Sequence, residues 1–208
     1  MSSYLPIDPM IIPYILLVVS VIIWTFIPFR QFRGNYFVFF LILAMLDPLM
    51  LFVVKLFHVH PFRFYSISSI FLIFSLLDFD LIKKRIPLIT TIALGNTLIA
   101  IFANLQILKI DLLLQNIIIE YLILERTTLY IQGNNCINYF HLALNFYVVT
   151  LIIKDFVVLI DVKTGVYYFY ITSSFEILIG LYFLFVNEKN SAIYMLESDG
   201  KMRNNTVN

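Results

Sequence analysis

The chain has 208 residues, of which 61% are hydrophobic and only 13% charged, and its net charge is +1 at pH 7. Soluble domains average about 45–50% apolar and about 25% charged residues, so the charges here are too few to cover a water-facing surface. The near-neutral charge gives no reason to expect a nucleic-acid partner. The single cysteine, Cys136, excludes an internal disulfide and a zinc site built from several cysteines. We therefore expect an all-α, polytopic integral membrane helix bundle in contact with the lipid bilayer.

Four long apolar runs make up the first half of the chain. The first, Met10–Phe29, has prolines near its ends and lacks the basic start and the cleavage site of a signal peptide, so we expect a retained helix. The second, Tyr36–Val54, is apolar apart from one aspartate and its following proline, and a helix of about 20 such residues crosses a bilayer. The third and fourth runs are Phe64–Ile82 and Ile86–Leu105.

The second half contains three further candidate helices. The segment Ile107–Arg126 carries charged and amide side chains among leucines and isoleucines, so it fits a buried span, a tilted helix or a helix at the membrane interface. The turn-forming residues 132–135 predict a loop. Two more apolar runs, Ile137–Ile160 and Val166–Val186, bring the expected total to about seven transmembrane helices.

The basic residues predict how this bundle is oriented. With seven spans and the N-terminus outside, nine lysines and arginines fall on the inner side and four on the outer side. Basic residues favour the cytoplasmic side, so we expect the C-terminus in the cytoplasm and the bundle in the cell's inner, or plasma, membrane. Residues 1–186 form the bundle in this interpretation, and residues 187–208 form a short polar cytoplasmic tail that is expected to be disordered.

Two carboxylates fall near the middle of predicted spans. Asp47 lies in Tyr36–Val54, at a depth where an acidic side chain costs roughly 2.5–3.5 kcal/mol, so it should face the protein interior. Glu176 shares a helical face with Gly180 and with other small and polar residues. Each carboxylate fits either a cation- or proton-responsive site or a structural pair between helices. Lys154 is expected to extend towards the outer interface or to pair with an acid.

Four more polar residues are candidates for a polar core. His141 and Asn145 share one face of the sixth predicted helix. His141 fits a titrating or ligand-binding group, or a hydrogen bond within the bundle. Glu120 belongs to a polar stripe of the fifth segment, and Asn96 fits a polar cross-link between helices beside Gly95, which permits close approach.

Short motifs give little indication of catalysis. The pieces Glu120…Glu125-Arg126 and His141-x-x-x-Asn145 resemble parts of the motifs of intramembrane CAAX-type proteases, which implies a hydrolase using Glu120, Glu125 and His141. The adjacent glutamate pair and the second histidine of that family are missing. No phosphate-binding loop, zinc-protease motif or serine-hydrolase motif occurs, so we assign no catalytic residue and expect no cofactor.

The pair His58-Val59-His60 invites a metal interpretation. Two histidines in a short connection without a carboxylate or a third histidine nearby fit a solvated loop better, so we expect no metal site.

Three classes of function remain. The first is a sensor or accessory subunit that acts through a separate membrane or cytoplasmic protein partner, and the absence of a catalytic motif favours it. The second is a small transporter or channel that uses Asp47 and Glu176. The third is the CAAX-protease-like hydrolase described above.

Overall fold

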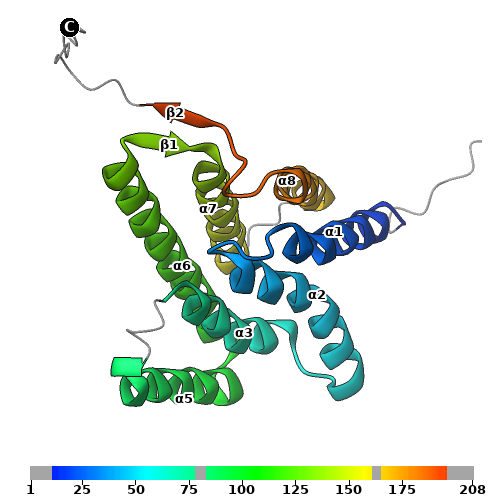
Figure 1. Cartoon of the computed structure of the whole chain (residues 1–208). Coiled ribbons are helices and arrows are strands. Elements are labelled where there is room, and N and C mark those ends of the chain that lie inside the picture. The colour runs from blue at the N-terminus through cyan, green and yellow to red at the C-terminus, as the bar shows by residue number, and fades with distance from the viewer. Residues whose placement is uncertain (1–10, 78–82, 161–164, 196–208) are drawn as a thin grey trace, which may run out of the picture.

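The computed structural model describes residues 11–77, 83–160 and 165–195, and within these ranges the chain is all-helical apart from one short two-stranded ribbon (Figure 1). The helices are α1 (Ile11–Arg30), α2 (Phe37–Phe57), α3 (Pro61–Leu76), α5 (Ile86–Phe102), α6 (Leu105–Asn134), α7 (Tyr139–Leu159) and α8 (Gly165–Phe185). The strands are β1 (Cys136–Asn138) and β2 (Ile193–Met195). The all-α class predicted from composition is thereby confirmed.

Asparagines define the limits of α6 and α7. The side chain of Asn104 accepts a hydrogen bond from the Ile107 amide at 2.9 Å and caps the start of α6. Asn135 ends α6 in the left-handed conformation, with φ at 53°. The predicted loop at residues 132–135 is therefore wrong for all but its last residue. Asn138 caps the start of α7, because its side chain accepts from the Phe140 amide.

The packing of the helices is uneven. α1 packs against α8 and α2, whereas α6 packs against both α3 and α7. α5 contacts α3 and lies at the edge of the bundle (Figure 1). The core consists of aromatic and aliphatic side chains from α1, α2, α3, α6, α7 and α8, and its fully buried members include Ile27, Phe40, Ile123, Phe140 and Phe183. Packing around these rings holds the helices that carry the polar residues described below.

Two of the described helices, α2 and α7, are long and apolar enough to cross a membrane. The described parts of the others supply shorter apolar helices at Ile15–Arg30, Pro61–Leu76, Ile86–Phe102 and Tyr170–Phe185. α6 is longer than any of these but carries several charged residues along its length. The expected number of seven spans is therefore not confirmed. Part of the difference arises at α3, which ends at Leu76, whereas the end predicted at Ile82 lies outside the described residues.

The ribbon joins the start of α7 to the segment after α8. β1 and β2 are antiparallel, and Cys136, Ile137 and Asn138 lie opposite Met195, Tyr194 and Ile193 in that order. The sixth span, predicted to begin at Ile137, thus begins two residues later as a helix, because β1 uses the backbone of residues 136–138 to pair with β2. Residues 187–195, which the sequence assigns to the polar tail, form a turn and β2.

Candidate functional site

A cavity of about 320 Å³ lies among α1, α2, α3, α6, α7 and α8. We call it the central cavity, and its ionisable lining residues are Asp47, Tyr65, Tyr147, Lys154, Asp155 and Glu176. Its size is at the lower end of the range for small-molecule sites, which is roughly 300–1,000 Å³. Charged side chains from three helices meet here, although most of the surrounding lining is apolar or aromatic.

One ion pair lies at the wall of the central cavity. Lys154 of α7 donates to Oε1 of Glu176 of α8 at 2.7 Å. The Lys154 side chain is 35% exposed and the Glu176 side chain 17%. Of the two alternatives for Lys154, the structure shows the pair with an acid. The ammonium thus neutralises one carboxylate and ties two helices together.

The other two acids of the central cavity have uncharged partners. The Tyr65 hydroxyl donates to Asp47 Oδ1 at 2.9 Å, and the Asn116 amide donates to Asp155 Oδ2 at 2.5 Å. Tyr65 belongs to α3 and Asn116 to α6, so each acid also links its own helix to a neighbour. These hydrogen bonds orient the carboxylates but contribute no positive charge.

Aromatic rings form one wall of the central cavity. The ring centroids of Trp24 and Tyr147 lie 4.7 Å apart, at an interplanar angle of 35°. Trp24 can approach α8 because a glycine faces it: a Cβ at Gly180 would lie 3.2 Å from Trp24 Nε1 and 2.9 Å from Ile23 Cγ2. Gly95 has no atom within 4 Å of such a Cβ, so the predicted close approach occurs at Gly180 and not at Gly95.

Asn96 belongs to a separate buried network between α3, α5 and α6. Its amide nitrogen donates to the Ser66 carbonyl at 2.9 Å, and its side-chain oxygen accepts from Gln115 at 2.7 Å. Gln115 also donates to Asp111, which accepts a further hydrogen bond from the Ser66 hydroxyl. The polar cross-link predicted for Asn96 is therefore present, and it attaches α5 to the bundle.

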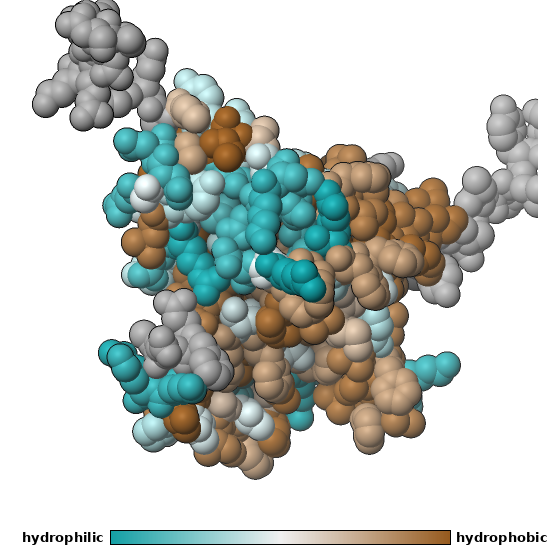
Figure 2. Space-filling view, in the orientation of Figure 1, coloured by the Kyte–Doolittle hydropathy of each residue, from teal (hydrophilic) through white to brown (hydrophobic). Residues whose placement is uncertain are grey.

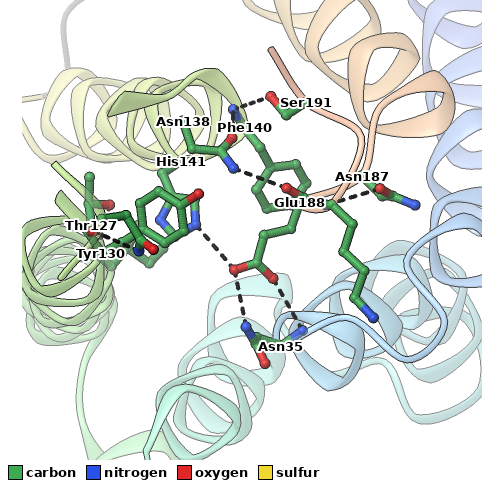
Figure 3. A network of polar contacts seen from close by, with 12 residues as sticks. Asn35, Thr127, Tyr130, Asn138, Phe140, His141, Asn187, Glu188 and Ser191 are labelled. Carbon is green, nitrogen blue, oxygen red and sulfur yellow. Dashed lines mark hydrogen bonds and ion pairs between the residues drawn. The ribbon is translucent and has the colours of Figure 1, made fainter. Parts of the chain in front are cut away.

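A second pocket, of about 310 Å³, lies beside the β1–β2 ribbon, and we call it the end pocket. Glu188 is at its centre (Figure 3): the carboxylate accepts from the Asn35 side chain at 3.1 Å and lies 3.2 Å from His141 Nε2. The Glu188 carbonyl accepts from Asn138 at 3.0 Å, and Ser191 accepts from the Phe140 amide at 2.9 Å. These contacts join the α1–α2 connection, the start of α7 and the segment after α8.

Glu188 and His141 form an ion pair when the imidazole is protonated. Their side chains are 13% and 3% exposed. Burial favours a raised pKa for Glu188, but hydrogen bonds from His141 and Asn35 outweigh it and hold the pKa below the ordinary glutamate value. The His141 ring also packs against Tyr36 and Tyr130, with centroid distances of 5.6 Å and 4.8 Å. The imidazole is therefore held on several sides.

Three fully buried phenylalanines separate the two pockets, and we call Phe40, Phe140 and Phe183 the aromatic plug. Phe183 lies 4.9 Å from Phe40 and 5.3 Å from Phe140, measured between ring centroids. On the side of the central cavity, Trp24 is 6.5 Å from both Phe40 and Phe183. On the other side, Phe140 is 6.0 Å from His141. A continuous run of rings thus connects the two pockets.

The structure divides the predicted site residues among different places. Asp47 and Glu176 both line the central cavity. His141 lies in the end pocket, and Asn145 donates to the Thr127 hydroxyl at 3.0 Å and to the His141 carbonyl. Glu120 lines neither pocket, and its buried Oε2 has no hydrogen-bond partner within the described ranges.

The residues of the protease resemblance are not assembled into one site. Neither Glu120 nor Glu125 lines the pocket that contains His141, and the Glu125 side chain is exposed. His141 contacts Glu188 instead. Among residues 11–77, 83–160 and 165–195 no group of three or more metal-ligating side chains is positioned to hold an ion. His60 caps α3, with its ring nitrogen accepting from the Phe62 amide at 3.4 Å.

Sequence reasoning missed several residues of these pockets. In the central cavity these are the aromatic residues Trp24, Tyr65 and Tyr147, which composition does not distinguish from other apolar positions. Glu188 and Asn35 were not singled out, because one follows the last helix and the other lies in a short connection. The run Asn187-Glu188-Lys189-Asn190 contains turn-forming residues, which indicate a return of the chain towards the bundle. Comparison with known protein families, with curated proteins and with solved structures finds no match to this chain.

Proposed function

We propose that the chain is a multi-pass membrane protein of sensor type, which binds a small polar ligand in the central cavity and acts through a protein partner. The observation that carries this proposal is the convergence of Asp47, Lys154, Asp155 and Glu176 from three helices on one cavity. Ionisable groups inside an apolar bundle are costly, so their convergence favours a binding role.

The exposed surface supports the membrane assignment. Each described helix exposes at least one large apolar side chain, and most expose several, including Phe52 of α2, Phe102 of α5 and Phe146 of α7. In the most apolar part of α2 and of α7 only 17% of the residues are buried, which is unlike the core helix of a soluble protein. Figure 2 shows hydrophilic side chains gathered towards one end of the visible face and hydrophobic ones over most of the rest.

The end pocket fits the cytoplasmic side of the proposed topology. Arg30, Arg33, Arg126 and Lys189 line this pocket or the adjoining surface. Basic residues concentrate on the cytoplasmic side of membrane proteins. We therefore place the β1–β2 ribbon on the cytoplasmic side of the plasma membrane, where it is accessible to a membrane or cytoplasmic protein partner.

The aromatic plug favours a sensor over an open channel. It fills the space between the two pockets with three fully buried rings. The same rings connect the central cavity physically to the end pocket on the cytoplasmic side. A ligand that moves Trp24 would displace the neighbouring rings of Phe40 and Phe183. A small transporter is the second candidate, favoured by the approach of the carboxylates Asp47 and Glu176 to one cavity.

A screen for binding and flux tests the proposed function. The protein is reconstituted in lipid nanodiscs, and small polar compounds that raise its thermal unfolding midpoint are identified. We expect Asp47→Asn to abolish such stabilisation and Glu125→Gln, an exposed control, to leave it intact. The identified compounds are then tested for uptake into proteoliposomes: binding without uptake supports a sensor, and uptake that Glu176→Gln abolishes supports a transporter. Equal stabilisation of the unmodified chain and Asp47→Asn would overturn binding in the central cavity.

A further inference from the structure

The central cavity carries more negative than positive groups. Its lining holds three carboxylates, Asp47, Asp155 and Glu176, and one ammonium, Lys154. Lys154 is paired with Glu176, whereas the closest hydrogen-bond donors to Asp47 and Asp155 are uncharged. In the part of the chain that the structure describes, those two acids have no lysine, arginine or histidine within ion-pair distance. The Lys154 ammonium acts on both from a greater distance, so one positive charge is shared among three carboxylates.

A carboxylate removed from water is destabilised unless a positive charge compensates for it. A cation placed between Asp47 and Asp155 would supply that charge. The hydrogen bonds that Tyr65 and Asn116 donate would continue to orient both carboxylates. The electrostatics of the cavity therefore favour a positively charged occupant over an anionic one.

The hydroxyl of Tyr147 gives the cavity wall a further polar group. Tyr147 lines the central cavity and is only 6% exposed. Its ring contacts Trp24, but its hydroxyl makes no hydrogen bond to any residue that the structure describes. An occupant of the cavity that offers an acceptor, or that holds a water molecule there, would give this hydroxyl a hydrogen-bond partner.

The remaining lining suits an organic cation better than a metal ion. Leucines from four helices and the rings of Phe62, Trp24 and Tyr147 make up much of the wall. A divalent metal ion requires several oxygen ligands in a regular shell, whereas an alkylammonium group packs against aliphatic side chains and is attracted to aromatic faces. The cavity combines acids with such faces.

We infer that the central cavity binds a small organic cation, an amine or a quaternary ammonium compound, through Asp47, Asp155 and the Trp24–Tyr147 wall. This inference rests on the proposed function and specifies the ligand class. The positive group lies between the two acids, and the hydrocarbon part contacts the leucines and the rings. A small cation is required because the volume is about 320 Å³.

Trp24 is the single tryptophan of the chain, so its fluorescence reports on the central cavity without labelling. The protein in lipid nanodiscs is titrated with choline, with its uncharged carbon isostere dimethylbutanol, and with the anion trimethylacetate. We expect choline to change the fluorescence with an affinity at least about tenfold higher than that of dimethylbutanol, and trimethylacetate to have no effect.

Variants distinguish binding by charge from binding by shape. Asp47→Asn and Asp155→Asn should each lower the choline affinity by about tenfold or more and leave any dimethylbutanol response unchanged. Asp111→Asn is the matched control, because Asp111 lies outside the cavity in the Asn96 network. A monomeric elution profile and an unchanged helical circular dichroism spectrum identify the variants that are folded, and either aspartate variant alone suffices for the comparison.

Three outcomes would overturn the inference. If dimethylbutanol binds as tightly as choline, or trimethylacetate binds more tightly, the ligand class is wrong although the cavity still binds a ligand. If none of the three probes alters the fluorescence, the cation inference fails, and the proposed function is judged separately by its own screen of polar compounds.

Discussion

The ammonium of Lys154 lies 2.7 Å from Oε1 of Glu176, so α7 and α8 are joined by an ion pair at the wall of the central cavity. The two helices share a smaller contact with each other than α6 and α7 do. The pair therefore contributes to holding α8 in place, and Asp47 and Asp155 of the cavity have no ion pair of their own among the described residues.

Removing one partner of this pair should destabilise the protein more than removing both. Lys154→Met leaves a partly buried Glu176 without counter-charge, and Glu176→Gln leaves Lys154 in the same situation. We expect each to lower the free energy of unfolding by about 2 kcal/mol, less than for a fully buried pair because the Lys154 side chain is 35% exposed. The double variant should recover about half of that loss. Thermal unfolding in detergent measures the effect, and additive losses in the double variant would contradict it.

Gly180 is expected to be intolerant of a methyl group. In Gly180→Ala the new Cβ would lie 2.9 Å from Ile23 Cγ2, so α1 must move away from α8. We expect a loss of about 1–3 kcal/mol of unfolding free energy and a shift in the Trp24 emission maximum, since that indole is the next nearest group. Unfolding and emission spectra of the purified variant test this.

Gly95→Ala provides the matched control, because a Cβ there has nothing within 4 Å. We expect it to be neutral or stabilising by up to about 1 kcal/mol, as alanine favours a helix over glycine. Equal destabilisation by the two substitutions would show that helix propensity, and not the close approach of α1 and α8, determines the result.

The positions of the helices could largely be predicted from the sequence, because apolar runs bounded by polar turns determine them. The predicted run Met10–Phe29 differs from α1 by one residue at each end, and Val166–Val186 differs from α8 in the same way. The largest error is at the end of α6, which continues to Asn134 instead of ending at Arg126. Capping side chains account for smaller differences of two residues. Asn104 caps α6 two residues before the predicted start of that helix. Asn138 is the last residue of β1 and caps α7, which begins two residues after the predicted start.

The contacts within the candidate site could be predicted only in part. Placing Asp47 and Glu176 in the protein interior follows from the cost of burying an acid. That they share a cavity depends on how α2 packs near α8, which no local pattern in the sequence encodes. Similarly, His141 stands out as an ionisable residue in a helix, whereas its partner Glu188 is 47 residues away in the chain and follows the last helix.

Asn96 should be required for the attachment of α5. Replacing it with leucine removes the hydrogen bond to the Ser66 carbonyl and leaves the Gln115 amide with one partner fewer. We expect the free energy of unfolding to fall by about 1–3 kcal/mol, because buried polar groups lose their hydrogen-bond partners. Thr90→Val is the control, since Thr90 is exposed and bonds only within its own helix. Faster proteolysis near α5 in Asn96→Leu, but not in Thr90→Val, is the expected observation. Equal rates would show that α5 is held by apolar contacts alone.

The end pocket should make stability depend on acidic pH. The pKa of Glu188 is lower in the folded chain than the ordinary value of about 4.3, so its ionised form stabilises the folded state at higher pH. This contribution is lost as the pH falls from about 4.3 through the folded-state pKa. We therefore expect the unfolding midpoint of the unmodified chain to fall over that range. In Glu188→Gln the unfolding midpoint should fall less over this pH range. At neutral pH the same variant should have a free energy of unfolding about 1 kcal/mol lower than that of the unmodified chain.

The buried thiol of Cys136 offers a second measurement at fixed pH. Cys136 lies in β1 opposite Met195, and the contacts of Glu188 hold the segment that leads to β2. Glu188→Gln should therefore accelerate maleimide labelling of this single cysteine, whereas Glu125→Gln, which changes an exposed carboxylate on α6, should not. If Glu188→Gln leaves both the labelling rate and the acid dependence unchanged, the carboxylate does not fasten the ribbon to the bundle, and the apolar contacts of the aromatic plug must hold that end alone.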